Sequence, residues 1–291
     1  MKNTEKEVIN IVEELNLECI KREEEIKKLR MTGFRRKIKE FKENRIYGLI
    51  SHKPLENGYT YSKNNIIKDK PKIVVYSCIT GNYDKILEPT LLFDDVKFSM
   101  YTDNCNIKAE NWTIRNIDEF KQSDNILANR YAKFHPFELF KDTDYDYSIY
   151  IDGNVKVVGD IRSLIYSVSE KTGLSLHRHI QRDDVYKEAK ACILLKKGEK
   201  HFIKKQMKKY QALKFPKKYG LLECTIIVTD LSNLNAKKIY KEWWKEFIDS
   251  KSMRDQLSLP YTLWKFGYTL DDVGSLGDNE YRNPIFRIYS H

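Results

Sequence analysis

The feature that most constrains the fold is an uncharged run of strand-forming residues that ends in three polar ones. Residues 147–151 read YSIYI, and Asp152, Gly153 and Asn154 follow them directly. Aromatic and β-branched side chains without a charge are typical of a buried strand. The polar residues then lie at the carboxyl end of that strand, where open α/β sheets bind ligands. An ordinary turn is the alternative interpretation, because Asp, Gly and Asn are also common turn residues.

The remaining chain alternates between strand-like and helix-like segments. Further strands are expected at residues 73–79, 96–101, 112–117, 155–158, 174–179 and 221–229. Helices are expected at residues 125–134, 161–168, 184–195, 201–213 and 233–250. Strands that alternate with helices predict an α/β domain with a mixed or parallel sheet flanked by helices.

Residues 1–50 have a different character and predict a helical arm. A heptad pattern of apolar residues runs from Val8 to Leu29, which indicates self-association through residues 1–30 or, alternatively, one helix packed on the domain. Residues 35–45 then carry six basic and two acidic side chains in an amphipathic pattern. Such a segment predicts contact with an anionic membrane surface, with a solvated charged face as the alternative.

Composition sets the domain organisation and the compartment. Residues 51–70 are polar and turn-rich, so we expect an arm at 1–50, a linker at 51–70 and a globular domain at 71–291. The five cysteines are scattered, and no apolar run approaches the length of a membrane span. These features predict a cytoplasmic protein, with the basic segment allowing peripheral association with the inner face of the plasma membrane.

The net charge of +10 predicts an anionic partner, but not a nucleic acid. The excess is divided, with 17 basic and 12 acidic residues in 1–70 and 35 and 30 in 71–291. No helix-turn-helix, finger or RNA-recognition motif accompanies it. Nucleotides, phosphates and acidic glycans fit the charge better.

Polar residues also follow the first two strands of the globular domain. Thr80, Gly81 and Tyr83 come directly after residues 73–79, and Asp103 follows the second strand. A glycine-containing loop after a strand is typical of nucleotide binding. The G-x-G-x-x-G and P-loop patterns are missing, so those two classes of nucleotide site are not supported.

Two further positions stand out by their charge. Arg130 and Lys133 share one face of the helix at 125–134, where they suit a diphosphate or, alternatively, form an ordinary exposed face. Glu223 lies inside an apolar strand, and a buried acid usually needs a partner or a function.

Taken in order, the segments resemble one family of glycosyltransferases. They are CITGNYD, YTD, NRYAKFHPFELF, YSIYIDGN, LHRHIQRDDVYKEA, GLLECTIIV and RDQLS. The set resembles the GT-A-like family that includes plant seed-mucilage and rhamnogalacturonan galacturonosyltransferases and bacterial relatives, over about residues 72–270. The resemblance implies a GT-A-like, Rossmann-like fold. It also implies sugar transfer from a nucleotide sugar, with UDP as the expected nucleotide, to an oligosaccharide or lipid-linked glycan in surface polysaccharide synthesis, such as a capsule.

The resemblance also implies roles for individual residues. The nucleoside and diphosphate would lie on Thr80, Gly81, Tyr83, Asp103, Arg130 and Lys133. A Mn²⁺ or Mg²⁺ ion would lie on Asp152 and Asn154, with His291 as a late ligand. The sugar and acceptor side would be formed by His179, Arg182, Asp183, Glu223, Asp255 and Gln256, of which Asp255, Glu223 and Asp183 are the candidate catalytic carboxylates.

Asn154 keeps a second interpretation open. It stands where the family pattern has a second acid, and a neutral amide donates less charge to a hard cation. A non-catalytic module that binds nucleotides or glycans with the same fold is therefore the alternative to an enzyme.

Overall fold

The computed structural model describes residues 15, 17–22, 70–104, 106–117 and 124–289. Apart from positions 15 and 17–22, the predicted arm lies outside the described residues. The predicted linker lies outside them except for Lys70, and His291 lies outside them as well. The account below therefore concerns the globular domain.

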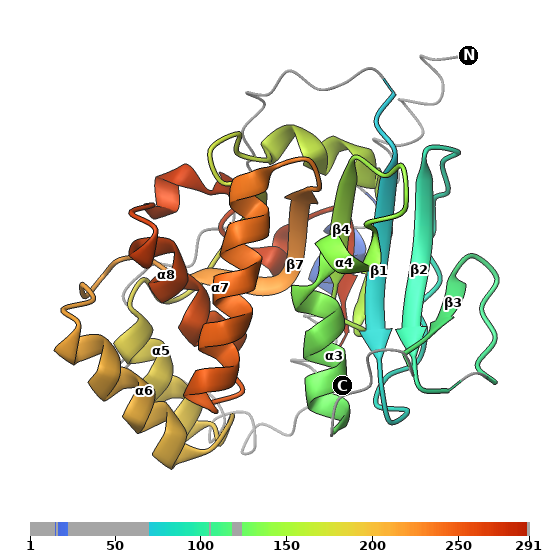
Figure 1. Ribbon diagram of the computed structural model, residues 1–291. Coiled ribbons are helices and arrows are strands. Elements are labelled where there is room, and N and C mark those ends of the chain that lie inside the picture. The colour runs from blue at the N-terminus through green and yellow to red at the C-terminus, as the bar shows by residue number, and fades with distance from the viewer. Residues whose placement is uncertain (1–14, 16, 23–69, 105, 118–123, 290–291) are drawn as a thin grey trace.

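The domain is built on a seven-stranded mixed sheet in the described part of the chain (Figure 1). Its strands are β1 (Ile73–Ile79), β2 (Val96–Thr102), β3 (Thr113–Asn116), β4 (Tyr147–Ile151), β6 (Leu174–Arg178), β7 (Leu222–Asp230) and β8 (Gly274–Ser275). The spatial order is β3-β2-β1-β4-β7-β6-β8. Neighbouring strands are parallel, except that β7 runs antiparallel to both β4 and β6. The predicted α/β class with a mixed sheet flanked by helices is confirmed.

Helices and a small second sheet surround this sheet. The α-helices are α3 (Asn125–Phe134), α4 (Pro136–Leu139), α5 (Val185–Leu194), α6 (Lys200–Ala212), α7 (Leu234–Ser250) and α8 (Asp255–Lys265). The 3-10 helices are η2 (Ile161–Ser167), η3 (Leu270–Asp272) and η4 (Glu280–Arg282). The second sheet pairs β5 (Val155–Val157) with β9 (Phe286–Ile288). None of the helices in the described ranges is both long and apolar enough to cross a bilayer.

Both faces of the sheet are buried, which explains why its strands lack polar alternation. Along β1, Val74 and Tyr76 belong to a core shared with α3, α7 and α8. The intervening Ile73 and Val75 belong to a second core, shared with η2 and the small sheet. A third cluster joins α5, α6 and α8.

Local sequence explains where α3 begins and ends. The Asp124 side chain accepts a hydrogen bond from the backbone N–H of Leu127, so it is the N-terminal cap of α3. Pro136 has no backbone N–H to continue the helix, and α3 ends at Phe134 before a short second helix starts. The helix expected at 161–168 is instead a 3-10 helix, capped by Asp160.

The sheet topology brings distant polar residues to one edge. β1, β2 and β4 are parallel, so the residues that follow them emerge at the same edge. Because β7 is antiparallel to β4, its amino end, with Glu223, reaches this edge too. The edge therefore combines the polar loops after three strands with a carboxylate from the start of a fourth.

Candidate active site

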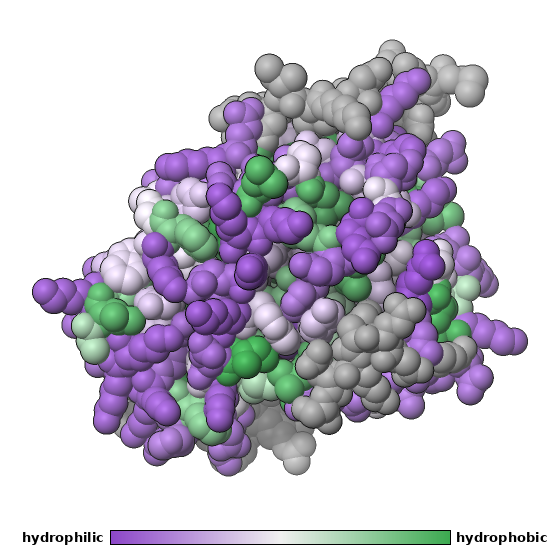
Figure 2. Space-filling model, in the orientation of Figure 1, coloured by the Kyte–Doolittle hydropathy of each residue, from purple (hydrophilic) through white to green (hydrophobic). Residues whose placement is uncertain are grey.

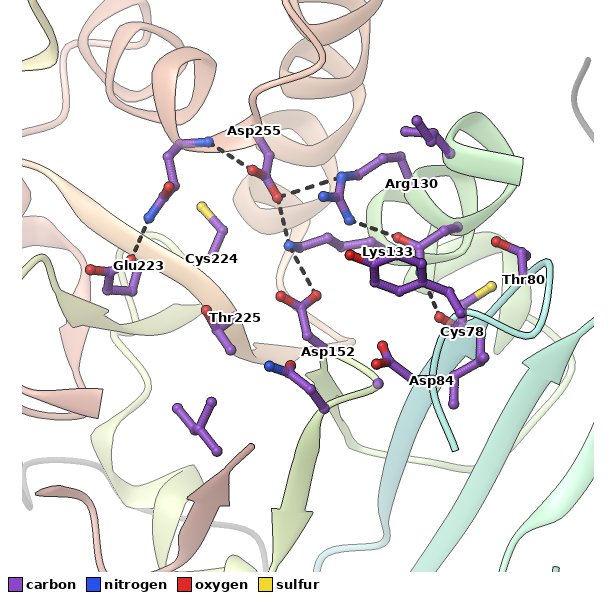
Figure 3. Close-up of a pocket in the computed structure, with 18 of the residues that line it drawn as sticks. Cys78, Thr80, Asp84, Arg130, Lys133, Asp152, Glu223, Cys224, Thr225 and Asp255 are labelled. Atoms are coloured by element: carbon purple, nitrogen blue, oxygen red, sulfur yellow. Dashed lines mark hydrogen bonds and ion pairs between the residues drawn. The ribbon is translucent and has the colours of Figure 1, made fainter. Parts of the chain in front are cut away.

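A cavity of about 1230 Å³ opens at this edge of the sheet (Figure 3). Its walls come from the loops after β1 and β4, from α3, from the starts of β7 and α8, and from the last described residues. The predicted site residues that line it are Thr80, Gly81, Tyr83, Arg130, Lys133, Asp152, Asn154, Glu223, Asp255 and Gln256. Most of the predicted site residues are thus brought together.

At the centre of the cavity wall, Lys133 lies between two aspartates (Figure 3). Its Nζ is 2.6 Å from Asp255 Oδ2 and 3.5 Å from Asp152 Oδ1. The Lys133 side chain is only 1% exposed, so it needs these partners. The Tyr150 hydroxyl donates to the same Asp152 oxygen at 2.9 Å, and its ring lies below the ammonium group. The central strand and α3 are thereby joined through one carboxylate.

Asp255 is an ionised anchor for cations. Burial alone would raise its pKa, but the charges of Lys133, Arg130 and Arg254 hold the pKa well below its usual range. Its second oxygen accepts the backbone N–H of Gln256. The adjacent Trp243 donates its indole N–H to the Asp255 carbonyl at 3.2 Å, which positions the first turn of α8. A carboxylate with so low a pKa is a poor proton acceptor, so the geometry does not favour Asp255 as a catalytic base.

Arg130 and Lys133 share a face of α3, as their spacing predicts. Arg130 Nε lies 3.9 Å from Asp255 Oδ2, and its terminal nitrogen donates to Asn129 Oδ1 at 2.7 Å. The Asn129 amide in turn donates to the Cys78 carbonyl at the end of β1. The helix is therefore tied to β1, and its two cations face the cavity.

The loop after β1 is held by hydrogen bonds from two sides. Thr80 Oγ1 donates to the Asn125 carbonyl at 2.9 Å, and the Gly81 N–H meets both carboxylate oxygens of Asp103 at 3.1 Å. Gly81 has a φ of +64°, a conformation that glycine adopts without strain. Asp103 does not line the cavity, so it contacts the loop rather than the cavity space. Tyr83, 71% exposed, stands at the rim.

The Asp152-Gly153-Asn154 segment is both a turn and part of the cavity wall. The Val155 N–H donates to the Asp152 carbonyl at 3.0 Å and closes the turn. Asn154 exchanges two hydrogen bonds with Tyr289: its Nδ2 donates to the Tyr289 carbonyl at 2.7 Å, and its carbonyl accepts the Tyr289 N–H at 2.9 Å. The amide thus fixes the last described residue beside the turn.

Gly153 allows a second carboxylate to approach this turn. A Cβ at this position would lie 2.9 Å from Asp84 Oδ2 and 2.9 Å from Ile79 Cγ1, so a larger residue would displace one of them. Asp84 lines the cavity and lies near Asp152 in Figure 3. Although position 154 lacks an acid, the turn therefore has carboxylates on two sides.

The described residues fit a cation that is shared with a ligand rather than one held by protein alone. Nowhere in the described ranges do three or more His, Cys, Asp or Glu side chains group closely enough to hold a metal ion. Asp84, Asp152 and Asn154 supply two carboxylates and one amide. Mg²⁺ is usually bound by one or two carboxylates together with substrate phosphates, and this set matches that pattern.

The far wall of the cavity carries two buried glutamates with raised pKa values. Glu223 accepts a hydrogen bond from Gln256 Nε2, and its other oxygen lies 3.5 Å from His179 Nε2. Burial raises its pKa to about 7, with a further contribution from the charge of Glu280. Burial likewise raises the pKa of Glu280 to about 7. Glu280 is hydrogen-bonded to Thr225, and both residues line the cavity.

Glu280 also has an unused oxygen. The residue is only 4% exposed, and its Oε2 is buried without a hydrogen-bond partner among the described residues. A buried polar atom without a partner is costly and calls for an explanation.

Behind Glu223 lies a buried ionic network that does not line the cavity. His179 Nδ1 accepts the backbone N–H groups of Gln181 and Arg182, both at 3.1 Å. Its Nε2 lies 3.0 Å from a terminal nitrogen of Arg182, 3.4 Å from Glu188 and 3.5 Å from Glu223. Burial alone would raise the pKa of Glu188, but the hydrogen bond from His179 and the charge of Arg182 hold it at about 2.

The remaining predicted residues therefore occupy other places. His179 and Arg182 support Glu223 from behind and do not reach the cavity. Asp183 also lies away from the cavity, with one buried oxygen that has no partner among the described residues. Its backbone carbonyl accepts the Gly220 N–H, and its predicted place on the acceptor side stays a prediction. His291 lies outside the described residues.

Several cavity residues escaped the sequence analysis. Glu280 stands in a short turn without a motif, 128 residues after the central turn, and only the fold brings it close. Arg254 and Thr225 lie within the segments RDQLS and GLLECTIIV, but the sequence gives no signal that assigns them a role. Asp84 ends the CITGNYD segment, and an acid in a loop directly after a strand is the signal that could have marked it as a site residue.

The comparisons with known proteins place the chain in a glycosyltransferase-like class. Residues 47–291 match the family described as TOD1/MUCI70, glycosyltransferase-like domain. The match covers most of the chain, so the chain belongs to this family. None of the curated protein sequences matches the chain.

Three solved glycosyltransferase structures resemble the chain at a distance. The galactosyltransferase LgtC, solved with donor and acceptor sugar analogues, is 12% identical with a TM-score of 0.38 over 75% of this chain and 87% of that one. The bifunctional glycosyltransferase WbbM is 13% identical with a TM-score of 0.37 over 70% of this chain and 38% of that one. GlyE of Streptococcus pneumoniae TIGR4 is 10% identical with a TM-score of 0.37 over 70% of this chain and 44% of that one. The chain spans less than half the length of the latter two.

Proposed function

We propose that the protein is a GT-A-like glycosyltransferase that moves a sugar from a nucleotide sugar, most simply a UDP-sugar, to a glycan acceptor. The acceptor would be an oligosaccharide or a lipid-linked glycan of a surface polysaccharide such as a capsule. Membership of the TOD1/MUCI70 family, which is described as a glycosyltransferase-like domain, supports sugar transfer as the general activity. The donor, acceptor and compartment are part of the proposal.

The observation that carries the proposal is the pair of cations on α3, Lys133 buried and Arg130 half-buried, that faces the end of β4. Arg130 and Lys133 point into a cavity at the carboxyl ends of parallel strands. Asp255 and Asp152 hold both of them in place before any ligand arrives. Cations fixed in this way suit a phosphate group, since little reorganisation is needed when the charge develops.

In the proposed reaction, the bond between the anomeric carbon of the sugar and the diphosphate oxygen breaks. An acceptor hydroxyl oxygen forms the new bond to the same carbon, and the hydroxyl proton passes to a base. The electron pair of the broken bond leaves with the nucleoside diphosphate. Arg130 and Lys133 stabilise that negative charge, and the loop at Thr80 and Gly81 holds the nucleoside end.

For the base, we favour Glu280 over Asp255. A base is most effective when its pKa lies near the working pH, and the pKa of Glu280 is about 7. Its Oε2 lacks a partner among the described residues, whereas both Asp255 oxygens are engaged. Glu223, held by Gln256 and lying near His179, would instead orient the acceptor. This assignment suits an inverting reaction; a retaining one needs no base on the opposite face.

A divalent cation is part of the proposal as a shared ligand. Mn²⁺ or Mg²⁺ held by Asp152, Asn154 and Asp84 would neutralise diphosphate charge when bound. His291 stays a predicted further ligand, in a part of the chain that the structure does not describe. The arm at 1–50 would keep the enzyme on the cytoplasmic face of the membrane, with residues 35–45 on anionic lipid and residues 1–30 in self-association.

The test is a screen of nucleotide sugars with Mn²⁺ that measures release of nucleoside diphosphate. We expect release with at least one UDP-sugar. Asp152→Ala should lower the rate by about a hundredfold or more with the circular dichroism spectrum unchanged. Asp249→Ala, at an exposed position of α7, is the matched control and should keep the wild-type rate.

Two outcomes would contradict the proposal. UDP binding without turnover of any nucleotide sugar would indicate a non-catalytic binding module with this fold. Near-normal turnover by Asp152→Ala would show that the end of β4 is not the reaction site.

A further inference from the structure

The surface around α6 carries a charge far above the rest of the domain. Residues 196–218 contain one acid, Glu199, and no arginine. They contain ten lysines, and all ten are exposed: Lys196, Lys197, Lys200, Lys204, Lys205, Lys208, Lys209, Lys214, Lys217 and Lys218. We call this set the α6 lysine surface. Figure 2 shows mainly hydrophilic side chains at the lower left, where α5 and α6 lie in Figure 1.

The fold directs these lysines outward. On the inner side of α6, Ile203, Gln206, Met207 and Tyr210 are buried. Of the ten lysines, only Lys209 has an ion-pair partner in the described part of the chain, the Glu246 carboxylate at 2.5 Å. The packing of the domain therefore accounts for the inner face of α6 but leaves the charge of the outer face uncompensated.

Exposed leucines flank the lysines at both ends of α6. Leu194 and Leu195, before the helix, are 53% and 46% exposed, and Leu213, directly after it, is 48% exposed. Phe202, Tyr210 and Phe215 are not exposed, and His201 is the one exposed ring between residues 196 and 218. The surface therefore offers positive charge and aliphatic side chains, but no exposed Phe, Tyr or Trp on which bases could stack.

We infer that the α6 lysine surface binds a bilayer with anionic headgroups. Lysine ammonium groups are attracted to an anionic lipid surface as point charges, and exposed leucines can enter the interface between headgroups and acyl chains. Proteins that bind single-stranded nucleic acids typically use arginines and several exposed aromatic rings, whereas this surface has no arginine and one exposed ring, His201.

The position of this surface connects it with the cavity. Lys197 and Gly198, at its edge, also line the cavity wall. A domain that binds the bilayer through α6 therefore places the cavity rim beside the lipid surface. If the proposed function holds, an acceptor attached to a lipid can reach the donor site without leaving the membrane. Membrane binding itself does not depend on the proposed function.

The experiment is sedimentation of the full chain with vesicles of phosphatidylcholine, alone or mixed with anionic phosphatidylglycerol. Two variants are matched in charge and in exposure. They are Lys204→Gln/Lys205→Gln/Lys208→Gln on α6 and Lys237→Gln/Lys238→Gln/Lys241→Gln on α7. All retain residues 35–45, so the contribution of the predicted basic arm is the same in each.

We expect wild-type binding to the anionic vesicles that weakens with added salt. The α6 variant should bind about a hundredfold more weakly, since each lysine near anionic headgroups contributes about fivefold, and the α7 variant should bind like the wild type. Equal losses in both variants, or no loss in the α6 variant, would overturn the inference. Capture on a single-stranded oligonucleotide without vesicle binding would overturn it as well. A protein inactive toward every nucleotide sugar that still shows the α6-dependent binding would leave the inference intact.

Discussion

Glu280→Gln is expected to stabilise the folded protein at pH 8 far more than at pH 5. Glu280 is 4% exposed, and burial raises its pKa from the ordinary 4.5 to about 7. The folded protein therefore holds this proton more tightly than the unfolded chain does. The stability that the neutral carboxyl allows is fully present below pH 4.5 and is lost as the pH rises through 7. Glutamine is neutral at every pH and avoids this loss.

The magnitude follows from the two pKa values. At pH 8 the wild type loses about 3 kcal/mol through this group, and at pH 5 about 1 kcal/mol. The advantage of the variant should therefore grow by about 2 kcal/mol between these conditions. Glu223 faces the same wall and titrates in the same range, with His179, Glu188 and Arg182 nearby. Because the charge of Glu280 also raises the pKa of Glu223, its removal eases the ionisation of Glu223 and adds a smaller effect of the same sign.

The assay is urea unfolding, followed by tryptophan fluorescence at pH 5 and at pH 8. Trp243 is buried in the core and reports its exposure. Glu199→Gln, at an exposed position, is the control and should change stability by less than about 0.5 kcal/mol at either pH. A Glu280→Gln advantage that is equal at both pH values, or a variant less stable than wild type at pH 8, would refute the reasoning.

Three further predictions concern ligands. Arg130→Ala should weaken binding of UDP by about tenfold or more but leave uridine binding unchanged, because the lost contacts are to phosphate; calorimetry that shows equal losses would contradict this. Mn²⁺ should give a calorimetric binding signal only when UDP is present, since the described residues supply too few ligands on their own; tight binding of Mn²⁺ alone would contradict this. Replacing the six basic residues of 35–45 by glutamine should lower salt-sensitive binding to anionic vesicles. Unchanged sedimentation would show that this segment does not bind the membrane and favour the alternative of a solvated charged face.

Local structure was predictable where the sequence carries local signals. The bounds of β4 and α3 match their predicted ranges to the residue, because an uncharged β-branched run, an Asp cap and a His-Pro pair each act over a few residues. Arg130 and Lys133 share a face because helical spacing alone decides it. The turn after β4 is likewise readable from Asp152 to Asn154.

The arrangement of the acceptor side was not predictable in this way. The antiparallel direction of β7 depends on the whole chain path, and it decides that Glu223 lies at the same edge as Asp152. Glu280 lies in a short 3-10 turn that has no periodicity of its own. His179 follows two residues after His177, but the strand has an irregularity between Leu176 and His177, and β6 ends at Arg178. Beyond it, His177 meets Asn283, and His179, one residue past the end of β6, lies 3.5 Å from Glu223.

The most direct test of the central claim is a crystal structure of the protein with UDP and Mn²⁺. The account predicts that the diphosphate lies within hydrogen-bond distance of Arg130 and Lys133, with the uridine against the loop at Thr80 and Gly81. A nucleotide bound outside this cavity, or one whose phosphates point away from α3, would contradict it.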